Sequence, residues 1–132
     1  DFDFSFSARM NVGNFMYNNV ASNYGVYQNM YNSSGYINNI PSFINQSNFE
    51  SPQYLSSFYL SDASFFRMDN ISLGYTFQDL KEGEVGLRLY TTLQNAFVIT
   101  EYDGLDPEIS GGIDNNFYPR PRIFTLGFNI NF

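Results

Sequence analysis

The last ten residues of the chain alternate between large apolar side chains and small polar ones. The apolar positions are Phe124, Leu126, Phe128, Ile130 and Phe132. The positions between them hold Thr, Gly and Asn. Successive side chains of a β-strand point to opposite faces, so this pattern predicts a strand over residues 123–132 with one apolar face and one polar face. Three phenylalanines opposite such small polar groups suit lipid on one side and water on the other.

Three earlier segments show the same alternation, over residues 2–12, 66–77 and 85–95. Their polar faces carry the charges Asp3, Arg9 and Arg88. In residues 66–77 the apolar face continues upstream into Asp69 and Arg67, which we therefore expect to lie beyond the hydrocarbon. An unpaired charge in hydrocarbon costs roughly 2 to 4 kcal/mol, so this sorting favours a membrane sheet. A soluble sheet with one wet face would sort its charges in the same way.

The connections between the four segments alternate in length. Residues 78–84 make a short turn, whereas residues 13–64 and 96–122 form long polar loops. Outer-membrane barrels have short periplasmic turns and long extracellular loops. We therefore predict an all-β membrane barrel in which the turn is periplasmic and both loops are extracellular. Four strands cannot close a barrel, the smallest having about eight, and the chain opens in mid-pattern, so we expect a carboxy-terminal fragment.

Composition argues against several other functions. The net charge is -7 and only six Lys and Arg are scattered along the chain, which disfavours nucleic acid as a partner. The chain has no Cys and no His, so it lacks a thiolate nucleophile, the usual general base and the commonest metal ligand. We expect no catalytic residue, no cofactor and no metal site.

Four ordered motifs resemble the SusC/RagA group of TonB-dependent outer-membrane transporters. They are SDASFFRMDNISLGYTF from Ser61, LRLYTTLQNAF over 87–97, EYDGLDPEIS over 101–110 and FYPRPRIFTLGFNINF over 117–132. The resemblance implies the last four strands of a barrel of about 22 strands in the outer membrane of a Gram-negative bacterium, in contact with its lipid. It also implies import of large nutrients, either glycans or peptides, with a SusD-like surface lipoprotein as partner. The rest of the barrel, the plug domain and the contact with TonB would belong to the part of the polypeptide before Asp1.

Two sets of residues are candidates for specific roles. Five tyrosines in the Asn-rich loop are candidates for contact with substrate or lid, because rings beside amides suit such recognition, although the same rings can simply pack the loop. They are Tyr17, Tyr24, Tyr27, Tyr31 and Tyr36. In the last strand, Phe128, Ile130 and the terminal Phe132 resemble the signal read by the outer-membrane assembly machinery.

The acidic residues Asp103, Asp106 and Glu108 leave two other interpretations open. They could offer oxygen ligands to Ca²⁺, but Gly104 and Pro107 favour a structural turn. Asp103 and Glu108 could also be the carboxylate pair of a glycoside hydrolase fragment. The other alternative to a transporter is a secreted soluble β-sandwich that binds glycans through its Tyr- and Asn-rich loop.

Overall fold

The computed structural model describes residues 1–80 and 85–131. Its strands far outnumber its short helices, in agreement with an all-β chain. It divides into two compact units, which we describe separately. The sheet unit comprises Asp1–Val12, Phe65–Thr100 and Arg120–Phe132, and the loop unit comprises Gly13–Ser64 and Glu101–Pro119.

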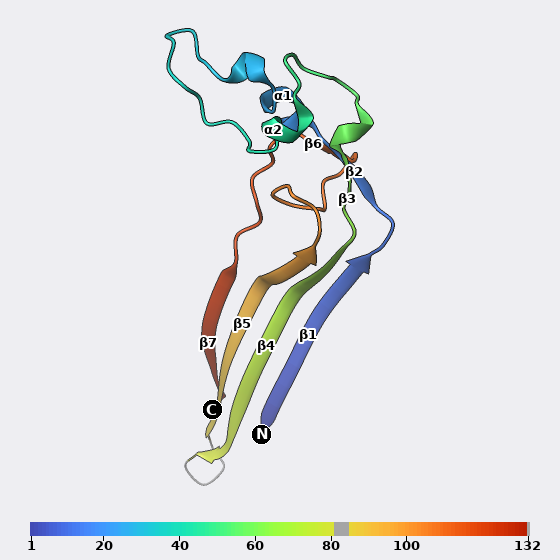
Figure 1. The fold of residues 1–132 in the computed structure, drawn as a ribbon. Coiled ribbons are helices and arrows are strands. Elements are labelled where there is room, and N and C mark those ends of the chain that lie inside the picture. Colours follow the sequence, from blue (N-terminus) through green and yellow to red (C-terminus); the bar gives the residue numbers. More distant parts are fainter. Residues whose placement is uncertain (81–84, 132) are drawn as a thin grey trace. The chain divides into compact units, whose positions relative to one another are not determined.

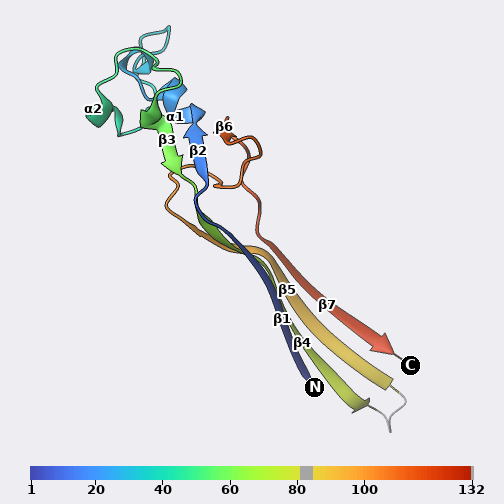
Figure 2. The ribbon, with the colours of Figure 1, turned by 90° about the vertical axis from the view of Figure 1, so that its right-hand side faces the viewer.

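The sheet unit is a four-stranded antiparallel sheet in the order β1-β4-β5-β7 (Figure 1). Its strands are β1 (Phe2–Asn11), β4 (Phe65–Leu80), β5 (Val85–Thr100) and β7 (Ile123–Asn131). Figure 2 shows them as a single layer. β4 and β5 are each 16 residues long and run past the predicted segments 66–77 and 85–95. Residues 81–84 of the predicted turn lie outside the described residues.

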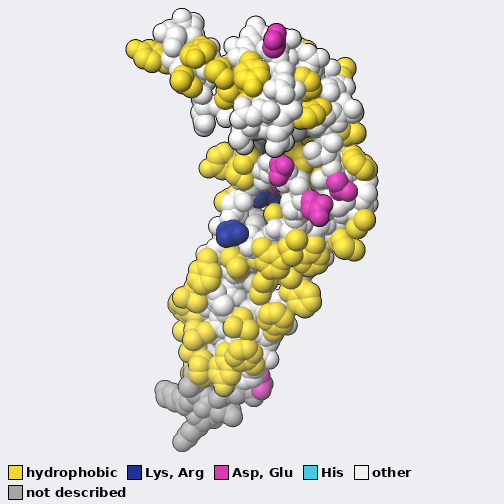
Figure 3. All heavy atoms as spheres, viewed as in Figure 1, with side chains coloured by type: hydrophobic (Ala, Val, Ile, Leu, Met, Phe, Trp, Pro, Cys, Tyr) yellow, Lys and Arg dark blue, Asp and Glu magenta, His cyan; other side chains and the backbone are white. Residues whose placement is uncertain are grey.

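The register of this sheet gathers the apolar side chains on one face. Directly paired residues of neighbouring strands share a face, and Phe4 pairs with Leu73, which pairs with Thr91, which pairs with Leu126. The face is exposed within the chain: 61% of Phe4 and 77% of Leu126 are accessible. Figure 3 shows hydrophobic side chains gathered along these strands. The sheet therefore presents an apolar surface that no other described element of its unit covers.

A β-bulge in β4 corrects one sequence-based prediction. Asn70 pairs with Ser7 but Met68 pairs with Ala8, so Asp69 is an extra residue and the alternation changes phase there. Arg67 consequently pairs with Arg9, which places it on the polar face, and the carboxylate of Asp69 accepts hydrogen bonds of 2.9 and 3.1 Å from Arg9 Nε. The expectation that Asp69 and Arg67 continue the apolar face was wrong.

The loop unit contains secondary structure that the sequence analysis left as loop. Its three strands form a small sheet in the order β3-β2-β6, with β2 and β6 parallel. They are β2 (Phe15–Asn18), β3 (Leu60–Asp62) and β6 (Ile113–Asp114). The short helices are α1 (Asn19–Tyr24), η1 (Tyr27–Asn29), α2 (Ile44–Ser47) and η2 (Ser57–Tyr59). A core of Met16, Ala63 and Tyr102 joins the two chain segments of the unit.

Among the described residues, every helix is too short or too polar to cross a membrane.

Candidate functional site

The polar face of the sheet unit carries an ordered set of polar contacts. Arg88 Nη2 donates a 2.8 Å hydrogen bond to Asp3 Oδ1, and the guanidinium lies 5.5 Å from the centre of the Tyr90 ring. Tyr90 packs over Gly127, where any Cβ would overlap the ring. On the same face the hydroxyls of Ser72 and Thr92 lie 3.0 Å apart. Charges and hydroxyls that pair with one another in this way suit a surface in contact with water.

The two units differ sharply in charge. The sheet unit contains six acidic and six basic residues. The loop unit contains seven acidic residues and no Lys or Arg. The seven are Glu50, Asp62, Glu101, Asp103, Asp106, Glu108 and Asp114. The whole net charge of the chain therefore resides in the loop unit.

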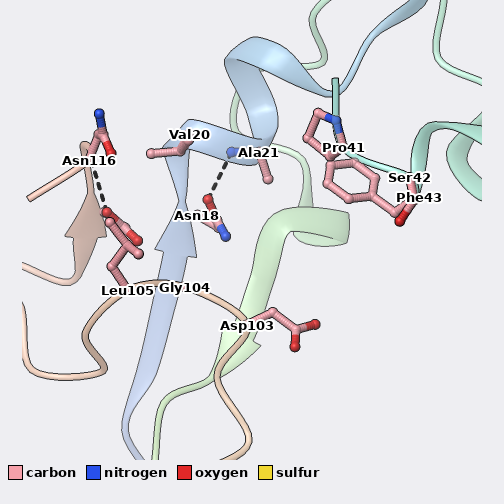
Figure 4. Close-up of a pocket in the computed structure, with 11 residues that line it drawn as sticks. Asn18, Val20, Ala21, Pro41, Ser42, Phe43, Asp103, Gly104, Leu105 and Asn116 are labelled. Atoms are coloured by element: carbon pink, nitrogen blue, oxygen red, sulfur yellow. Dashed lines mark hydrogen bonds between the residues drawn. The ribbon is translucent and has the colours of Figure 1, made fainter. Parts of the chain in front are cut away.

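Two hollows in the loop unit form the candidate binding site. The large hollow has a volume of about 590 Å³ and the small hollow about 190 Å³. Four residues line both: Asn18, Ala21, Phe43 and Asp103. Figure 4 shows that these residues come from separate segments, with Asn18 at the end of β2, Phe43 before α2 and Asp103 in the connection after β5. The site exists only because the fold brings these segments together.

Local contacts fix the position of the shared residues. Asn18 is the N-cap of α1, and its Oδ1 accepts a 2.8 Å hydrogen bond from the backbone N–H of Ala21. The Phe43 ring packs against Gly25, where a Cβ would overlap it, and its centre lies 6.4 Å from that of Tyr59. A larger residue at Gly25 would therefore displace the Phe43 ring from the wall.

The two carboxylates of the large hollow have different surroundings. Asp114 is buried, its Oδ2 accepts a 2.8 Å hydrogen bond from the Tyr102 hydroxyl and its Oδ1 accepts one of 3.0 Å from Asn116 N–H. Burial, together with the hydrogen bond to Asp114, raises the pKa of Tyr102 above its ordinary value. Asp103 is exposed and has no hydrogen-bond or ion-pair partner among the described residues. Asp114 therefore stabilises the unit, and Asp103 is available to a ligand.

One buried polar atom in the small hollow is unsatisfied. Tyr59 is only 3% exposed, and its hydroxyl finds no hydrogen-bond partner within the described chain. Burial, with a smaller contribution from Tyr17, raises the pKa of this hydroxyl, so it stays protonated. Buried polar groups in native proteins are nearly always hydrogen-bonded, so this hydroxyl is a donor that a bound group could satisfy.

The five predicted tyrosines do not meet at this site. Tyr17 is half-buried, donates a 2.9 Å hydrogen bond to Ser22 Oγ and accepts one from Leu55 N–H, which is a packing role. Tyr24, Tyr31 and Tyr36 are exposed on the loop unit, and Tyr27 lies half-buried in η1. None of the five lines the large or the small hollow. Their contact with substrate or lid remains a prediction.

The acidic motif after β5 separates into two parts. Asp106 is buried and its Oδ1 accepts a 2.9 Å hydrogen bond from Glu108 N–H, which closes a turn around the buried Pro107. Asp103 lines both hollows, whereas Asp106 and Glu108 line neither. Within residues 1–80 and 85–131, no group of three acidic residues is placed to hold a metal ion.

In the last strand, Phe128 and Ile130 are exposed on the apolar face, and Phe132 lies outside the described residues. Their proposed role as an assembly signal remains a prediction.

Comparison with known proteins finds relatives along the whole chain. The chain is 39% identical to the TonB-dependent receptor SusC of Bacteroides thetaiotaomicron over 138 aligned residues, which cover 100% of this chain and 14% of SusC. It is 37% identical over 93 residues to TonB-dependent receptor P3 of Formosa agariphila, covering 59% of this chain and 9% of that protein. No protein-family model matches the chain.

Solved structures with the same fold belong to the RagAB peptide importer. Its open-open state matches 99% of this chain and 16% of the compared chain, with a TM-score of 0.73 and 23% identity. Its closed-closed state matches the same shares with a TM-score of 0.74 and 21% identity. The chain thus spans a small part of each protein that it resembles.

Proposed function

Because the chain belongs to the SusC/RagA-type TonB-dependent receptors, we propose that it is a segment of one and that its sheet unit forms part of the barrel wall of an outer-membrane importer. The observation that carries this proposal is the two-faced sheet. Large apolar side chains such as Phe4 and Leu126 are exposed on one face, and the ion-paired charges lie on the other. A membrane barrel requires apolar residues toward lipid and polar residues toward its lumen.

The edges of the sheet support a barrel that other strands complete. β1 and β7 are the outer strands of the described sheet, and each pairs with a neighbour on one side only. Lipid cannot hydrogen-bond the free backbone groups of an open edge, so a sheet in a membrane must close. We propose that further strands of the receptor pair with these edges, and that the receptor's plug domain lies inside the closed barrel.

We propose that the whole receptor imports large nutrients, glycans or peptides, across the outer membrane of a Gram-negative bacterium. A SusD-like lipoprotein would cover its outer side, and TonB would drive it through a part of the receptor beyond this chain. The loop unit would then face the medium, with the exposed rings of Tyr24, Tyr31 and Tyr36 available to the lipoprotein or the substrate. The support is the relationship to the SusC receptor and the shared fold with the RagAB importer.

The two alternative functions have less support. A β-sandwich needs two facing sheets, but the four long strands form a single layer. A glycoside hydrolase would need two carboxylates across one cleft, and of the proposed pair only Asp103 lines a hollow. We propose that this chain makes and breaks no covalent bonds.

Single cysteines test the membrane wall, because the chain has no native Cys. In the full receptor, with any other cysteines replaced, a fluorophore is attached at Leu126→Cys or at its neighbour Thr125→Cys. Leu126 lies on the apolar face and Thr125 on the polar one. We expect brominated lipid to quench the fluorophore at position 126, and aqueous iodide to quench it at position 125. Equal iodide quenching at both positions would contradict the proposal.

Phe132→Ser tests the proposed assembly signal. We expect less folded receptor in the outer membrane, while the surviving fraction binds substrate with unchanged affinity. Phe66→Ser on the apolar face of β4 is the matched control, because it removes the same ring away from the carboxy terminus. Normal assembly of Phe132→Ser would refute the signal.

A further inference from the structure

We infer that the large and small hollows of the loop unit together bind the positively charged side chain of a peptide, lysine or arginine, with the Asp103 carboxylate as its counter-ion. This inference rests on the proposed function and narrows its substrate class from glycans or peptides to peptides that carry basic residues.

The dimensions and walls of the hollows suit a side chain with an apolar stem. The large hollow, at about 590 Å³, falls within the range of small-molecule sites, roughly 300 to 1,000 Å³. Its apolar wall includes Val20, Pro41, Phe43 and Leu105. The alkyl stem of lysine or arginine buries well against such a surface while its charged end reaches a polar group. Phe43 and Asp103 line the same hollow, so one ligand can contact both an aromatic ring and a carboxylate.

The charge of the loop unit selects the sign of the ligand. The unit contains seven acidic residues and no Lys or Arg. The Asp103 carboxylate lies at the junction of the two hollows without a partner among the described residues. An anionic glycan would meet repulsion there, whereas an ammonium or guanidinium group would gain a charge-assisted hydrogen bond.

The occupied polar groups of the walls favour a peptide side chain over a sugar. A sugar ring needs several hydrogen bonds from its site, because each of its hydroxyls loses water on binding. Asn18 Oδ1 already accepts from Ala21 N–H, and the Asp114 carboxylate already accepts from the Tyr102 hydroxyl and Asn116 N–H. Asp103 is the carboxylate left over. Ser42 and Asn116 also line the large hollow, but Asp103 is the charged group of these described walls that has no partner, and it matches one charge on an alkyl stem.

The buried hydroxyl of Tyr59 offers a ligand one further hydrogen-bond donor. Tyr59 lines the small hollow with Asp103 and Phe43, and its hydroxyl, which is buried beneath that wall, has no hydrogen-bond partner among the described residues. A buried, unsatisfied hydroxyl costs the folded protein about as much as a lost hydrogen bond. A carbonyl of the peptide main chain could accept from this hydroxyl while the charged side chain reaches Asp103.

The test measures binding of acetyl-Lys-Lys-Lys-amide, carrying a fluorophore, to the purified full receptor by fluorescence anisotropy. We expect Asp103→Asn to raise Kd about tenfold or more, because hydrogen bonds to charged groups have that weight. Glu101→Gln is the matched control: it removes an equal charge two residues away, from a side chain that lines neither hollow. We expect it to change Kd less than about twofold.

Two further variants separate binding from folding. Tyr59→Phe removes the unsatisfied hydroxyl, so we expect an unchanged or higher Tm without peptide but a Kd raised severalfold. Phe43→Leu keeps the apolar volume and removes the ring face, which is expected to raise Kd about two- to fivefold. A Tyr59→Phe receptor that binds the peptide as well as the parent would overturn the role of Tyr59.

Three other probes identify the class of ligand. The same peptide with acetylated lysine side chains, and maltotriose, are both expected to bind at least about tenfold more weakly than the lysine peptide. Equal binding of either would overturn the requirement for positive charge. If a glucosamine trimer bound more tightly than the lysine peptide, the requirement for a positive charge would stand. The inference that the ligand is a peptide would be overturned. If the lysine peptide does not bind, or binds Asp103→Asn equally well, the inference fails even where lipid quenching at position 126 supports the barrel wall.

Discussion

The sheet unit and the loop unit differ in how they are stabilised and in their charge, although they belong to one short chain. The sheet unit holds its shape through backbone pairing along four strands, and it exposes its apolar side chains. The loop unit buries a small core of Met16, Ala63 and Tyr102, and its side-chain oxygens accept hydrogen bonds that cap a helix and close turns. The first has balanced charge and the second has acids only. The comparison teaches that the exposed apolar face of the sheet unit fits the lipid contact that we propose, whereas the polar side chains of the loop unit fit water.

The largest effect is expected from a charge placed on the apolar face of the sheet unit. Phe6 is 62% exposed and pairs with Ile71 on that face. In the full receptor, Phe6→Arg would place a charge in hydrocarbon, which costs about 2 to 4 kcal/mol near the bilayer midplane. We expect a severalfold to complete loss of folded receptor from isolated outer membranes, measured by its heat-modifiable migration on gels.

The matched control for this variant is Ser5→Arg, one residue away on the polar face, opposite Ser72. It adds the same charge to the same strand and should leave the folded fraction near that of the parent. If the two variants lose equal amounts of receptor, the faces of the sheet do not differ in environment, and the comparison between the units collapses.

A medium effect is expected within the loop unit. Tyr102→Phe removes the hydroxyl that donates to the buried Asp114 carboxylate, which we expect to cost about 1 to 3 kcal/mol of local stability. Hydrogen exchange should quicken in residues 101–119 and stay unchanged in the strands of the sheet unit. Tyr118→Phe is the control, since Tyr118 is 91% exposed. Faster exchange throughout both units would show that they unfold together.

The same tyrosine predicts a response to alkaline pH. Its pKa is raised in the folded unit by burial and by Asp114, so the folded state holds the proton more tightly than the unfolded chain. This contribution is complete below the ordinary tyrosine value of about 10 and is lost as pH rises above it. Cleavage of the loop unit by subtilisin should therefore accelerate above that pH in the parent. In Tyr102→Phe the acceleration should be weaker.

The smallest effect is expected on the polar face of the sheet unit. Asp3→Asn keeps the shape of the side chain and removes the charge that pairs with Arg88. The pair is well exposed, and exposed ion pairs often contribute nothing measurable, while Arg88 keeps its contact with the Tyr90 ring. We expect unchanged folded receptor and Tm. A marked loss of folded receptor or a lower Tm would show that the ion pair is less exposed to water in the receptor than in this chain.

Local alternation was enough to find the strands of the sheet unit. The pattern of β7 and of β1 is unbroken, so each paired residue of these two strands keeps its predicted face. The phase change at Asp69 could not be predicted, because a bulge depends on the partner strand: one residue of β4 stands opposite Asn95 and Ala96 of β5. Asn95 has a positive φ of 51°, which Asn tolerates better than most residues, and that is the only local signal.

The candidate site was harder to predict than the sheet. The acidic motif drew attention to Asp103, but as a metal ligand or a catalytic acid. Nothing near Asn18 or Phe43 in the sequence shows that they lie beside it, since some sixty to eighty-five residues separate each of them from Asp103. The number of tyrosines in the Asn-rich loop suggested a binding role for them. The walls of the hollows depend instead on the Asn18 cap, the Phe43 ring against Gly25 and the buried Asp114 carboxylate. Contacts of this kind follow from the fold.

The uniform sign of charge in the loop unit also has a kinetic consequence. The seven acidic residues of a unit that contains no Lys or Arg attract cations from solution over a distance set by the Debye length, roughly 8 Å at physiological ionic strength. Such a field raises the rate at which positively charged solutes encounter the surface and does not affect neutral ones. Added salt should therefore slow the encounter of cationic solutes with the loop unit and leave that of neutral solutes unchanged, so salinity would itself set which solutes reach this surface first.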